Sequence, residues 1–425
     1  MRGQACIGAR FAFCKTHRRV GGLARRELAA FARASFLSIL ASVPAGIYRP
    51  TYLESVSYLR PWEEVLVEEI TRLGAESVFV VAGTTFARNS AIEGQLVATL
   101  GRRLAGFKTG VRDHAPREDV VSIANDAREA QSDLILAVGG GSVIDAAKIV
   151  LLCYVADIRD SSQLGQFTAR RHPALPTHWP VRMGAIPTTL SGAEYTDFGG
   201  STDTQHKLKE AYGHPQMLPR FALLDPSVTV YTPQRLWLST GVRAIDHTIE
   251  TLCSPGTNPM ADAAAMHALK LLTRSLVRTH EEPGDLEARR QSMIGAWLAT
   301  VGLQSRVPMG ASHGIGHALG GTAGVPHGIT SCLMLPHVLR WNMGVNEMQQ
   351  RLISGILGDA SAEAADQVAD LVARLGLPRR LRDVGIQPEQ FAQIADVAFQ
   401  DPWTQVNPRP IESPNTIIQL LEMAW

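Results

Sequence analysis

The sequence predicts a fold in two parts, an α/β domain followed by an all-α domain. Between residues 47 and 226, short apolar runs alternate with amphipathic segments of helical spacing, which indicates βαβ units and a mostly parallel sheet. From about Tyr231 onward, apolar residues recur at helical spacing over long stretches with little strand signal. We therefore expect an α/β domain over residues 46–228 and a helical domain over residues 229–425.

Composition excludes several classes of protein. A chain of 425 residues is too long for one ordinary domain, and its 45% apolar content, 19% charged content and net charge of +1 are those of a globular protein. No excess of charge favours nucleic acid or a membrane surface, and no apolar run approaches the roughly 20 residues that span a bilayer. Five scattered cysteines without a CxxC pair favour a reducing compartment, the cytoplasm.

Residues 1–45 form a basic leader in which seven arginines face a single acid, Glu27. Such leaders are typical of mitochondrial transit peptides, which makes a mitochondrial location the alternative to the cytoplasmic one. The other interpretation is that this leader is disordered, or that the start of the chain is wrongly assigned. We favour this interpretation and expect the organised chain to begin near Ile47.

The elements of the first half follow from apolar spacing and from glycine breaks. The expected elements are, in order, a helix over Trp62–Leu73 ended by Gly74, a strand over Ser77–Ala82, a helix over Ala91–Leu104, a helix over Val120–Gln131, a strand over Leu134–Val138 and a helix over Val143–Cys153.

The glycine-rich turn Gly139–Ser142 lies directly between a predicted strand and a predicted helix. Glycines let the backbone approach an anion, and amides at a helix N-terminus point towards it, so this turn is a candidate phosphate cradle. A tight turn without a ligand is the other interpretation. The turn matches neither GxGxxG nor GxxxxGK[ST], so it is not an ordinary Rossmann or P-loop fingerprint.

Further along, Thr188 and Thr189 end a strand and open a hydroxyl-rich turn, which suits ribose or phosphate contacts or a simple side-chain turn. The polar stretch over residues 199–214 is either a hairpin or lid, or a solvated loop. It carries Lys207 and Lys209.

The second half is predicted to consist of helices. They are expected over Leu238–Leu252, Ala261–Thr279, Leu286–Leu303, Glu347–Ile356, Ser361–Leu375 and Glu389–Ala398. In the first of these, Arg243 and His247 are spaced i, i+4 and so share one face. A surface helix of mixed charge is the alternative interpretation.

The stretch Gly310–His337 holds four histidines among seven glycines. His313 and His317 lie at i, i+4, on one helical face. Val325-Pro326 then turns the chain away from helix, so that His327 can return towards the first pair. Converging imidazoles can bind a divalent metal or transfer protons, although scattered, hydrogen-bonded histidines would give the same spacing.

Four motifs taken together are similar to those of the iron-containing (group III) alcohol dehydrogenase family, in its maleylacetate reductase-like branch. They are GGGSVIDAAK, IPTTLSGAE, GVRAIDHTIE and HGIGHALGG with the following GVPHG and LPH. The resemblance covers roughly Ile47 to the C-terminus. It implies the architecture shared with dehydroquinate synthase, an α/β dinucleotide-binding domain and a helical domain.

The resemblance also implies site residues. The residues expected to bind NAD or NADP are Gly140, Gly141, Ser142, Asp145, Thr188, Thr189 and Lys207. In metal-dependent members an aspartate and three histidines hold Fe²⁺ or Zn²⁺; the histidines match His247, His313 and His327, whereas Arg243 stands at the aspartate position. A guanidinium cannot ligate a cation. Maleylacetate reductases also lack this aspartate, but the histidine block here is of the alcohol dehydrogenase form.

These observations lead to the hypothesis of an NAD(P)-dependent dehydrogenase or reductase. It would transfer hydride between nicotinamide and a CH–OH, C=O or C=C group of a small carbonyl or alcohol substrate. We favour a metal-free site in which Arg243 binds an oxo-acid such as maleylacetate and His317 or His247 moves the proton. The residues after the first strand include no acid that would repel the 2′-phosphate of NADP. NAD and NADP are therefore both allowed. A homodimer is expected, because dimers are common among such enzymes.

Three alternatives remain open from the sequence. The first is a Fe²⁺- or Zn²⁺-dependent dehydrogenase of short-chain alcohols with another ligand in place of the aspartate. The second is a metal-dependent lyase or synthase that uses NAD only transiently. The third is a nucleotide-binding protein without activity.

Overall fold

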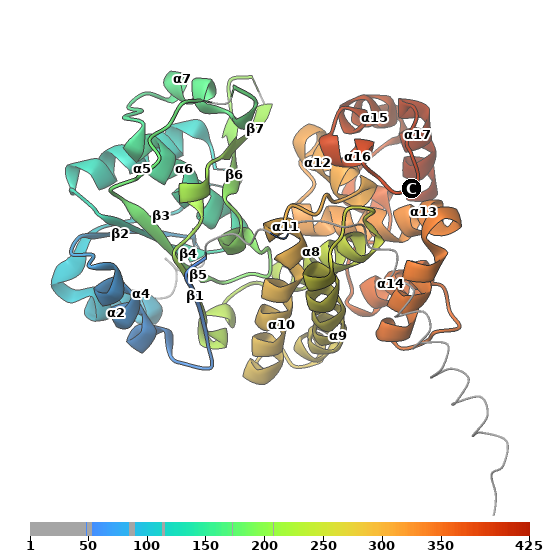
Figure 1. Ribbon diagram of the computed structural model, residues 1–425, viewed down its shortest axis with the longest axis horizontal. Coiled ribbons are helices and arrows are strands. Elements are labelled where there is room, and N and C mark those ends of the chain that lie inside the picture. The colour runs from blue at the N-terminus through green and yellow to red at the C-terminus, as the bar shows by residue number, and fades with distance from the viewer. Residues whose placement is uncertain (1–47, 49–52, 85–89, 113–114, 172, 207) are drawn as a thin grey trace, which may run out of the picture. The chain divides into compact units, whose positions relative to one another are not determined.

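The computed structural model describes residues 48, 53–84, 90–112, 115–171, 173–206 and 208–425 (Figure 1). The expected leader therefore lies outside the described residues, as does Lys207. Within the described part of the chain, no helix is long and apolar enough to cross a membrane.

A parallel sheet of six strands organises the first half, in the order β1-β8-β5-β4-β2-β3. The strands are β1 (Ser55–Tyr58), β2 (Val78–Ala82), β3 (Leu104–Thr109), β4 (Leu134–Gly139), β5 (Arg182–Pro187) and β8 (Phe221–Leu224). Apolar residues fill β2 and β4 without a break because both faces of the sheet are covered. The expected parallel sheet is thus confirmed.

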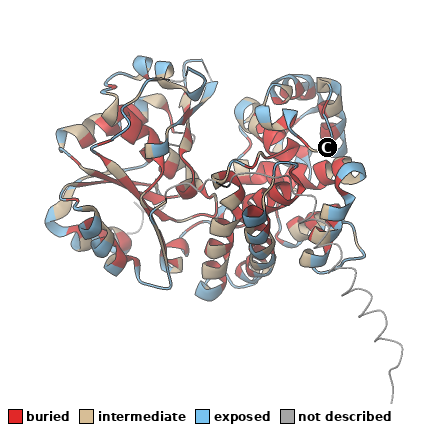
Figure 2. Cartoon of the chain, viewed as in Figure 1, coloured by how far each residue is buried: buried red, intermediate tan, exposed pale blue. Residues whose placement is uncertain are grey.

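Helices cover both faces of this sheet (Figures 1 and 2). Alternate residues of β2 and β4 pack on one side against α2 (Trp62–Leu73) and α4 (Ser90–Leu100), and on the other against α5 (Arg117–Glu129) and α6 (Gly141–Val155). The glycine turn joins β4 directly to α6, so it stands at the carboxyl end of a strand with neighbours on both sides, β2 and β5. Ligands bind at this edge in open α/β sheets.

The polar stretch after β5 is a hairpin. Strands β6 (Phe198–Asp203) and β7 (Leu208–Gly213) pair antiparallel, with Thr202 opposite Lys209. This outcome decides between the two interpretations of residues 199–214 in favour of the hairpin.

Helices make up the second half of the described chain. They are α8 (Gln234–Cys253), α9 (Pro259–Glu281), α10 (Leu286–Ala299), α11 (Val301–Gln304), α12 (Ala311–Ala323), α13 (His327–Leu357), α14 (Ala364–Arg374), α15 (Phe391–Phe399), α16 (Pro402–Gln405) and α17 (Pro414–Met423). Every residue of α8 from Trp237 to Cys253 is buried, so the surface-helix interpretation of this segment is wrong. Apolar residues of α9, α10, α12, α13, α14, α15 and α17 join those of α8 in one core.

Some boundaries differ from those predicted. The helix expected over Ala91–Leu104 ends at Leu100, because Gly101 takes a left-handed φ of 52°, and the chain then enters strand β3, which periodicity missed. The helix expected over Leu286–Leu303 breaks at Thr300. The segment Glu347–Ile356 is the end of α13, separated from its start by a kink at Asn346.

Candidate active site

Helix α8 supplies Arg243 and His247 one turn apart. Both are buried, with 8% and 6% of their surfaces exposed. The Arg243 Nη1 donates to Ser331 Oγ at 3.2 Å and lies 3.9 Å from Asp246 Oδ2. Burial lowers the pKa of the guanidinium, but an arginine stays charged in proteins. The site therefore contains a fixed positive charge.

A carboxylate from α8 orders the start of α12. Glu250 accepts the backbone amides of Gly310 at 2.8 Å and Ser312 at 2.9 Å, and lies 2.7 Å from His313 Nδ1. It thus replaces the side-chain cap that Gly310 cannot provide. A Cβ at Gly310 would stand 2.9 Å from the Glu250 carboxylate, so glycine is required for this close approach.

The imidazoles gather as the sequence predicted. The rings of His247 and His313 stack with centroids 4.8 Å apart, and those of His317 and His327 meet edge-on at 5.9 Å. The Trp403 ring joins the two pairs, at 4.9 Å from His317 and 5.5 Å from His313. His337, further along α13, is partly buried, and burial lowers its pKa to about 4.

His247 and His313 are neutral in this environment. Burial and the nearby Arg243 guanidinium hold the pKa of both imidazoles well below the usual value, and His313 adds to the shift of His247. Among the described residues, His247 Nδ1 and His313 Nε2 have no hydrogen-bond partner. The second nitrogen of His313, Nδ1, is held by Glu250, which fixes the ring with Nε2 free to meet a ligand.

Lys209, from the hairpin, reaches His327. Its Nζ lies 2.6 Å from Nε2 of that ring. Burial lowers the pKa of Lys209, Arg243 adds to the shift, and Asp145 opposes it. An ammonium can only donate, so Nε2 of His327 is the acceptor and its lone pair is used. The stretch from Gly199 to His214 therefore contributes to the site through Lys209.

Sequence reasoning did not select two functional candidates, the base Lys209 and the acid Asp401. Asp401 Oδ2 lies 2.9 Å from His317 Nδ1. Spacing gives no signal for either residue, because each contacts a histidine far away in the sequence.

The glycine turn has the properties of a nucleotide cradle. A Cβ at Gly140 would lie 2.8 Å from Thr189 Cγ2, and one at Gly141 would lie 2.9 Å from Ser191 Oγ. No side chain caps the N-terminus of α6, which begins at Gly141. Uncapped amides beside a close backbone approach fit the phosphates of a dinucleotide.

The other residues expected to bind the cofactor lie around this turn. Ser142 is the second residue of α6, and the amide of Thr188 donates to Gly139 O at 2.9 Å, which brings both threonines beside the glycines. Asp145, one turn into α6, accepts the amide of Gly200 at 3.2 Å. In the described structure this carboxylate therefore holds the hairpin against α6.

A divalent metal fits the expected histidine set poorly. His327 Nε2 already accepts from Lys209, and the Arg243 guanidinium supplies a second cation in place of the acidic ligand. A different triad, Asp246, Glu250 and His313, has ligand atoms within 4.8 Å of one another and could hold an ion. Most of these atoms accept amide or hydroxyl protons, since Asp246 Oδ2 binds Ser312 and Ser331.

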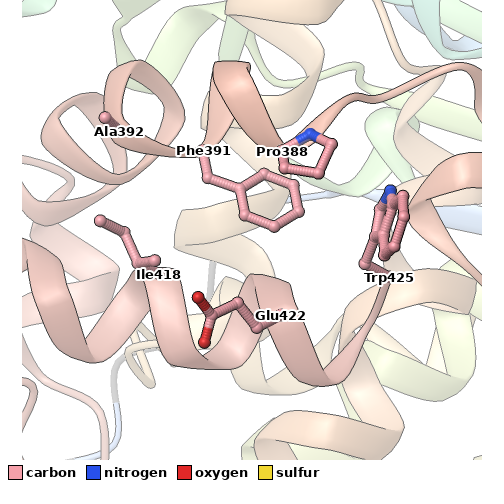
Figure 3. Close-up of a pocket in the computed structure, with 6 residues that line it drawn as sticks. All are labelled: Pro388, Phe391, Ala392, Ile418, Glu422 and Trp425. Atoms are coloured by element: carbon pink, nitrogen blue, oxygen red, sulfur yellow. The ribbon is translucent and has the colours of Figure 1, made fainter.

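An apolar pocket of about 400 Å³ lies elsewhere, between α15 and α17. Figure 3 shows Phe391, Ile418 and Trp425 around it. It holds one ionisable side chain, Glu422, and none of the histidines, so it lacks the groups that hydride transfer requires.

A parallel α/β sheet with a candidate nucleotide cradle, followed by helices that present imidazoles, is the architecture expected of a nucleotide-dependent oxidoreductase. The chain belongs to the iron-containing alcohol dehydrogenase family. The family models match at residues 63–226 ("Iron-containing alcohol dehydrogenase") and 237–425 ("Fe-containing alcohol dehydrogenase family, C-terminal").

Named relatives support this assignment. The chain is 32% identical over 410 residues to Dehydrogenase FUM7 of Gibberella moniliformis, covering 87% of this chain and 95% of the relative. It is 30% identical over 348 residues to Maleylacetate reductase 1 of Cupriavidus pinatubonensis, covering 82% and 88%. The crystal structure of a maleylacetate reductase from Agrobacterium tumefaciens superposes with a TM-score of 0.75 at 26% identity, covering 90% and 98%.

These relationships confirm two expectations. The chain has the α/β-plus-helical fold of the family, and it is an NAD(P)-dependent oxidoreductase of the maleylacetate reductase-like branch.

Proposed function

We propose that this chain reduces a small oxo-acid with NAD(P)H, and that it does so without a catalytic metal. The observation that carries the proposal is the buried Arg243 guanidinium beside two neutral imidazoles. A guanidinium has five N–H donors, and in the described structure Arg243 uses one, on Ser331. The others are available to a carboxylate or to an oxygen that gains negative charge.

The cofactor is assigned to the glycine turn. Gly140, Gly141 and Ser142 would face its phosphates, with Thr188 and Thr189 beside them. When bound, NAD(P)H supplies a hydride, and the protein orients it against the substrate. The described residues after β2, Gly83 and Thr84, are not acidic, so a 2′-phosphate is not repelled and NADP stays as acceptable as NAD.

The side chains stabilise the negative charge that forms on the substrate oxygen and supply the proton that neutralises it. As a carbonyl carbon, or an alkene carbon conjugated with the carbonyl as in maleylacetate, accepts a hydride, the carbonyl oxygen gains negative charge, which Arg243 stabilises through N–H donors. His317 then gives one proton to this oxygen, so that the product is an alcohol, or an enol that reverts to the ketone, and the imidazolium becomes a neutral imidazole. His247 is the second candidate proton donor, but its lowered pKa leaves it neutral near pH 7 and favours His317 for this role.

The substrate class follows from the fixed charge. An oxo-acid brings a carboxylate that a guanidinium can bind in a bidentate manner, and relatives named maleylacetate reductase make maleylacetate the first compound to test. A neutral alcohol or ketone would offer no carboxylate to the N–H donors of Arg243 that Ser331 does not use.

A second candidate is a Fe²⁺- or Zn²⁺-dependent alcohol dehydrogenase. The triad of Asp246, Glu250 and His313 favours it, because three ligand types converge there. Elemental analysis of the purified protein separates the two candidates. About one metal ion per chain, with activity lost on chelation, would overturn the metal-free proposal.

The decisive experiment compares Arg243→Met, Arg243→Lys and Arg243→Asp with the native protein. Arg243→Met should lower kcat/KM for maleylacetate about 100-fold or more, comparable to the loss of one oxyanion donor, and should change a neutral ketone less. Arg243→Asp should gain metal if the histidines can ligate one. The matched control is Arg289→Lys, because Arg289 is a buried arginine held by Pro283 and Thr229 outside the site.

Two finer features belong to the same proposal. We infer a cytoplasmic location, which the three free, buried cysteines at 153, 253 and 332 support. We also infer a homodimer; sedimentation of the purified protein tests it.

A further inference from the structure

The Nδ1 atom of His317 contacts an acid that lies far away in the sequence. The imidazole belongs to α12, and its Nδ1 lies 2.9 Å from Oδ2 of Asp401, which stands just before α16. These residues are 84 positions apart. The Asp401 carboxylate is mostly buried, with 18% of its side chain exposed, whereas 37% of the His317 side chain is exposed. The imidazole thus has one protected side and one open side.

The carboxylate is fixed independently of the histidine. Its second oxygen, Oδ1, accepts the amide of Trp403 at 2.9 Å and so caps the N-terminus of α16. The two oxygens of Asp401 therefore have separate roles: Oδ1 caps α16, and Oδ2 contacts the His317 imidazole.

Helix α16 is itself fitted closely to α12. A Cβ at Gly314 would stand 2.1 Å from Thr404 Oγ1, so only glycine permits this contact. The Trp403 ring then packs against His317 and His313. The segment from Asp401 to Thr404 thereby determines how the His317 ring is oriented.

We propose that Asp401 is a positioning residue that keeps a proton on Nδ1 of His317 and leaves Nε2 to exchange protons with the substrate. The inference rests on the proposed function, in which His317 is the proton donor. A carboxylate on Nδ1–H selects that tautomer and stabilises the imidazolium before the transfer. When Nε2 gives its proton to the substrate oxygen, Nδ1 stays protonated on Asp401, and the open side of the ring takes up the next proton from water.

The test uses Asp401→Asn, Asp401→Ser, His317→Asn and the double variant His317→Asn/Asp401→Asn in the full chain. Asparagine and serine both retain the helix cap. Neither can cap α16 and also accept from Nδ1–H, because asparagine has one oxygen and serine has a shorter side chain. Asp160→Asn, at the capped start of α7 (Ser161–Leu164), is the matched control for loss of an acid at a cap.

Two readouts are expected to change. The ¹⁵N spectrum of labelled histidine should show His317 protonated on Nδ1 in the native protein and shifted towards Nε2 in both Asp401 variants, with no substrate present. With maleylacetate and NADH, kcat should fall about 10- to 100-fold in these variants, while KM and the Kd for NADH change little. In the His317→Asn background, Asp401→Asn should have no further effect on kcat, because it acts through the imidazole.

The outcomes separate this inference from the proposed function. If His317→Asn keeps native activity, His317 is not the proton donor and the proposed function fails on that point. If His317→Asn is inactive but Asp401→Asn keeps native kcat and the Nδ1 tautomer, the positioning role of Asp401 alone is overturned. Equal losses for Asp401→Asn and the control Asp160→Asn would also overturn it.

Discussion

The ammonium nitrogen of Lys209 lies 2.6 Å from Nε2 of His327, across 118 residues of sequence. This contact connects the β6–β7 hairpin with the first turn of α13 and occupies the nitrogen that a metal would need. Two cations, Lys209 and Arg243, therefore lie at the site where the family resemblance predicts ligands for one metal ion.

Removing the Lys209 charge should therefore increase metal affinity. Arg243→Asp restores an acidic ligand, and adding Lys209→Met should remove the Nζ donor from His327 Nε2 together with a repelling charge. We expect Zn²⁺ to bind at least about 10-fold more tightly to the double variant than to Arg243→Asp, a difference of about 1.4 kcal/mol. Competition with a chelator measures this. Equal affinities would contradict the prediction, and the exposed Lys108→Met, combined with Arg243→Asp, is the control.

Arg117 should be required to hold the hairpin that carries Lys209. Its Nη1 lies 2.8 Å from Asp203 Oδ2 and its Nη2 lies 2.5 Å from Glu210 Oε2, and these three side chains are at most 12% exposed. Arg117→Met removes the guanidinium from both carboxylates and leaves Asp203 with His206 and Glu210 with the Tyr212 hydroxyl, so we expect a loss of local stability in the hairpin. Faster amide exchange in β6 and β7 and a higher Kd for NADH would report it.

A neighbouring ion pair provides the control for Arg117. Arg112, whose side chain is 60% exposed, pairs with Asp119 on the surface. Arg112→Met should change stability little, as is usual for exposed pairs. If Arg117→Met behaves in the same way, the hairpin is held by its backbone contacts and the prediction is wrong.

Glu194 should make the protein less stable in alkali. Burial raises the pKa of this carboxyl from 4.5 to about 7, with Lys148 opposing the shift. Because the folded-state pKa is the higher one, the contribution to stability is complete below about pH 4.5 and is lost as pH rises through about 7. At pH 8 the loss is up to about 3 kcal/mol, at 1.36 kcal/mol per unit of pKa shift.

Glu194→Gln removes this titration and serves as its own test. The difference in unfolding free energy between variant and native protein should increase in favour of the variant between pH 5 and pH 8, measured by urea denaturation. A difference that is constant with pH would show that Glu194 does not titrate in this range.

The cradle can be tested at Gly140. Alanine there would bring its Cβ to 2.8 Å from Thr189 Cγ2, so Gly140→Ala should weaken NADH binding by about 10-fold or more. The pair Gly140→Ala/Thr189→Ser removes the methyl group that clashes and should recover part of the affinity. Gly94→Ala is the control, since nothing lies within 4 Å of a Cβ at that position. No recovery would mean that the added methyl group blocks the ligand itself.

Local patterns in the sequence predict the fold well. Helix α2 has the predicted bounds, Trp62–Leu73, because its apolar spacing and Gly74 define both ends. The same kind of evidence places Arg243 with His247, and His313 with His317, because a helical turn connects each pair. The Val-Pro step likewise predicts the break before His327, where Pro326 is the residue before α13.

The missing parts of the site depend on contacts that no spacing records. Asp401 and Lys209 reach their histidines only after α16 and the hairpin have packed. Asp246 and Glu250 lie at i, i+4 on α8, but the amides and hydroxyls that surround them come from α12 and α13, which spacing along α8 does not reveal. Strand β3 was missed because its sequence, LAGFKT, is only partly buried at the sheet edge and lacks a clear apolar run.

The position of Asp401 in the chain has a consequence for biosynthesis. A ribosome that has translated as far as residue 340 has already produced all six strands of the sheet, the glycine turn, Arg243 and every histidine of the cluster. Asp401, the acid that contacts His317, is translated about 60 codons later. Domains tend to fold as they emerge, so under the roles proposed above a nascent chain acquires its nucleotide-binding half early and its proton-handling pair last. Capture of the cofactor and the ability to turn over substrate are thereby separated in time for each newly made molecule.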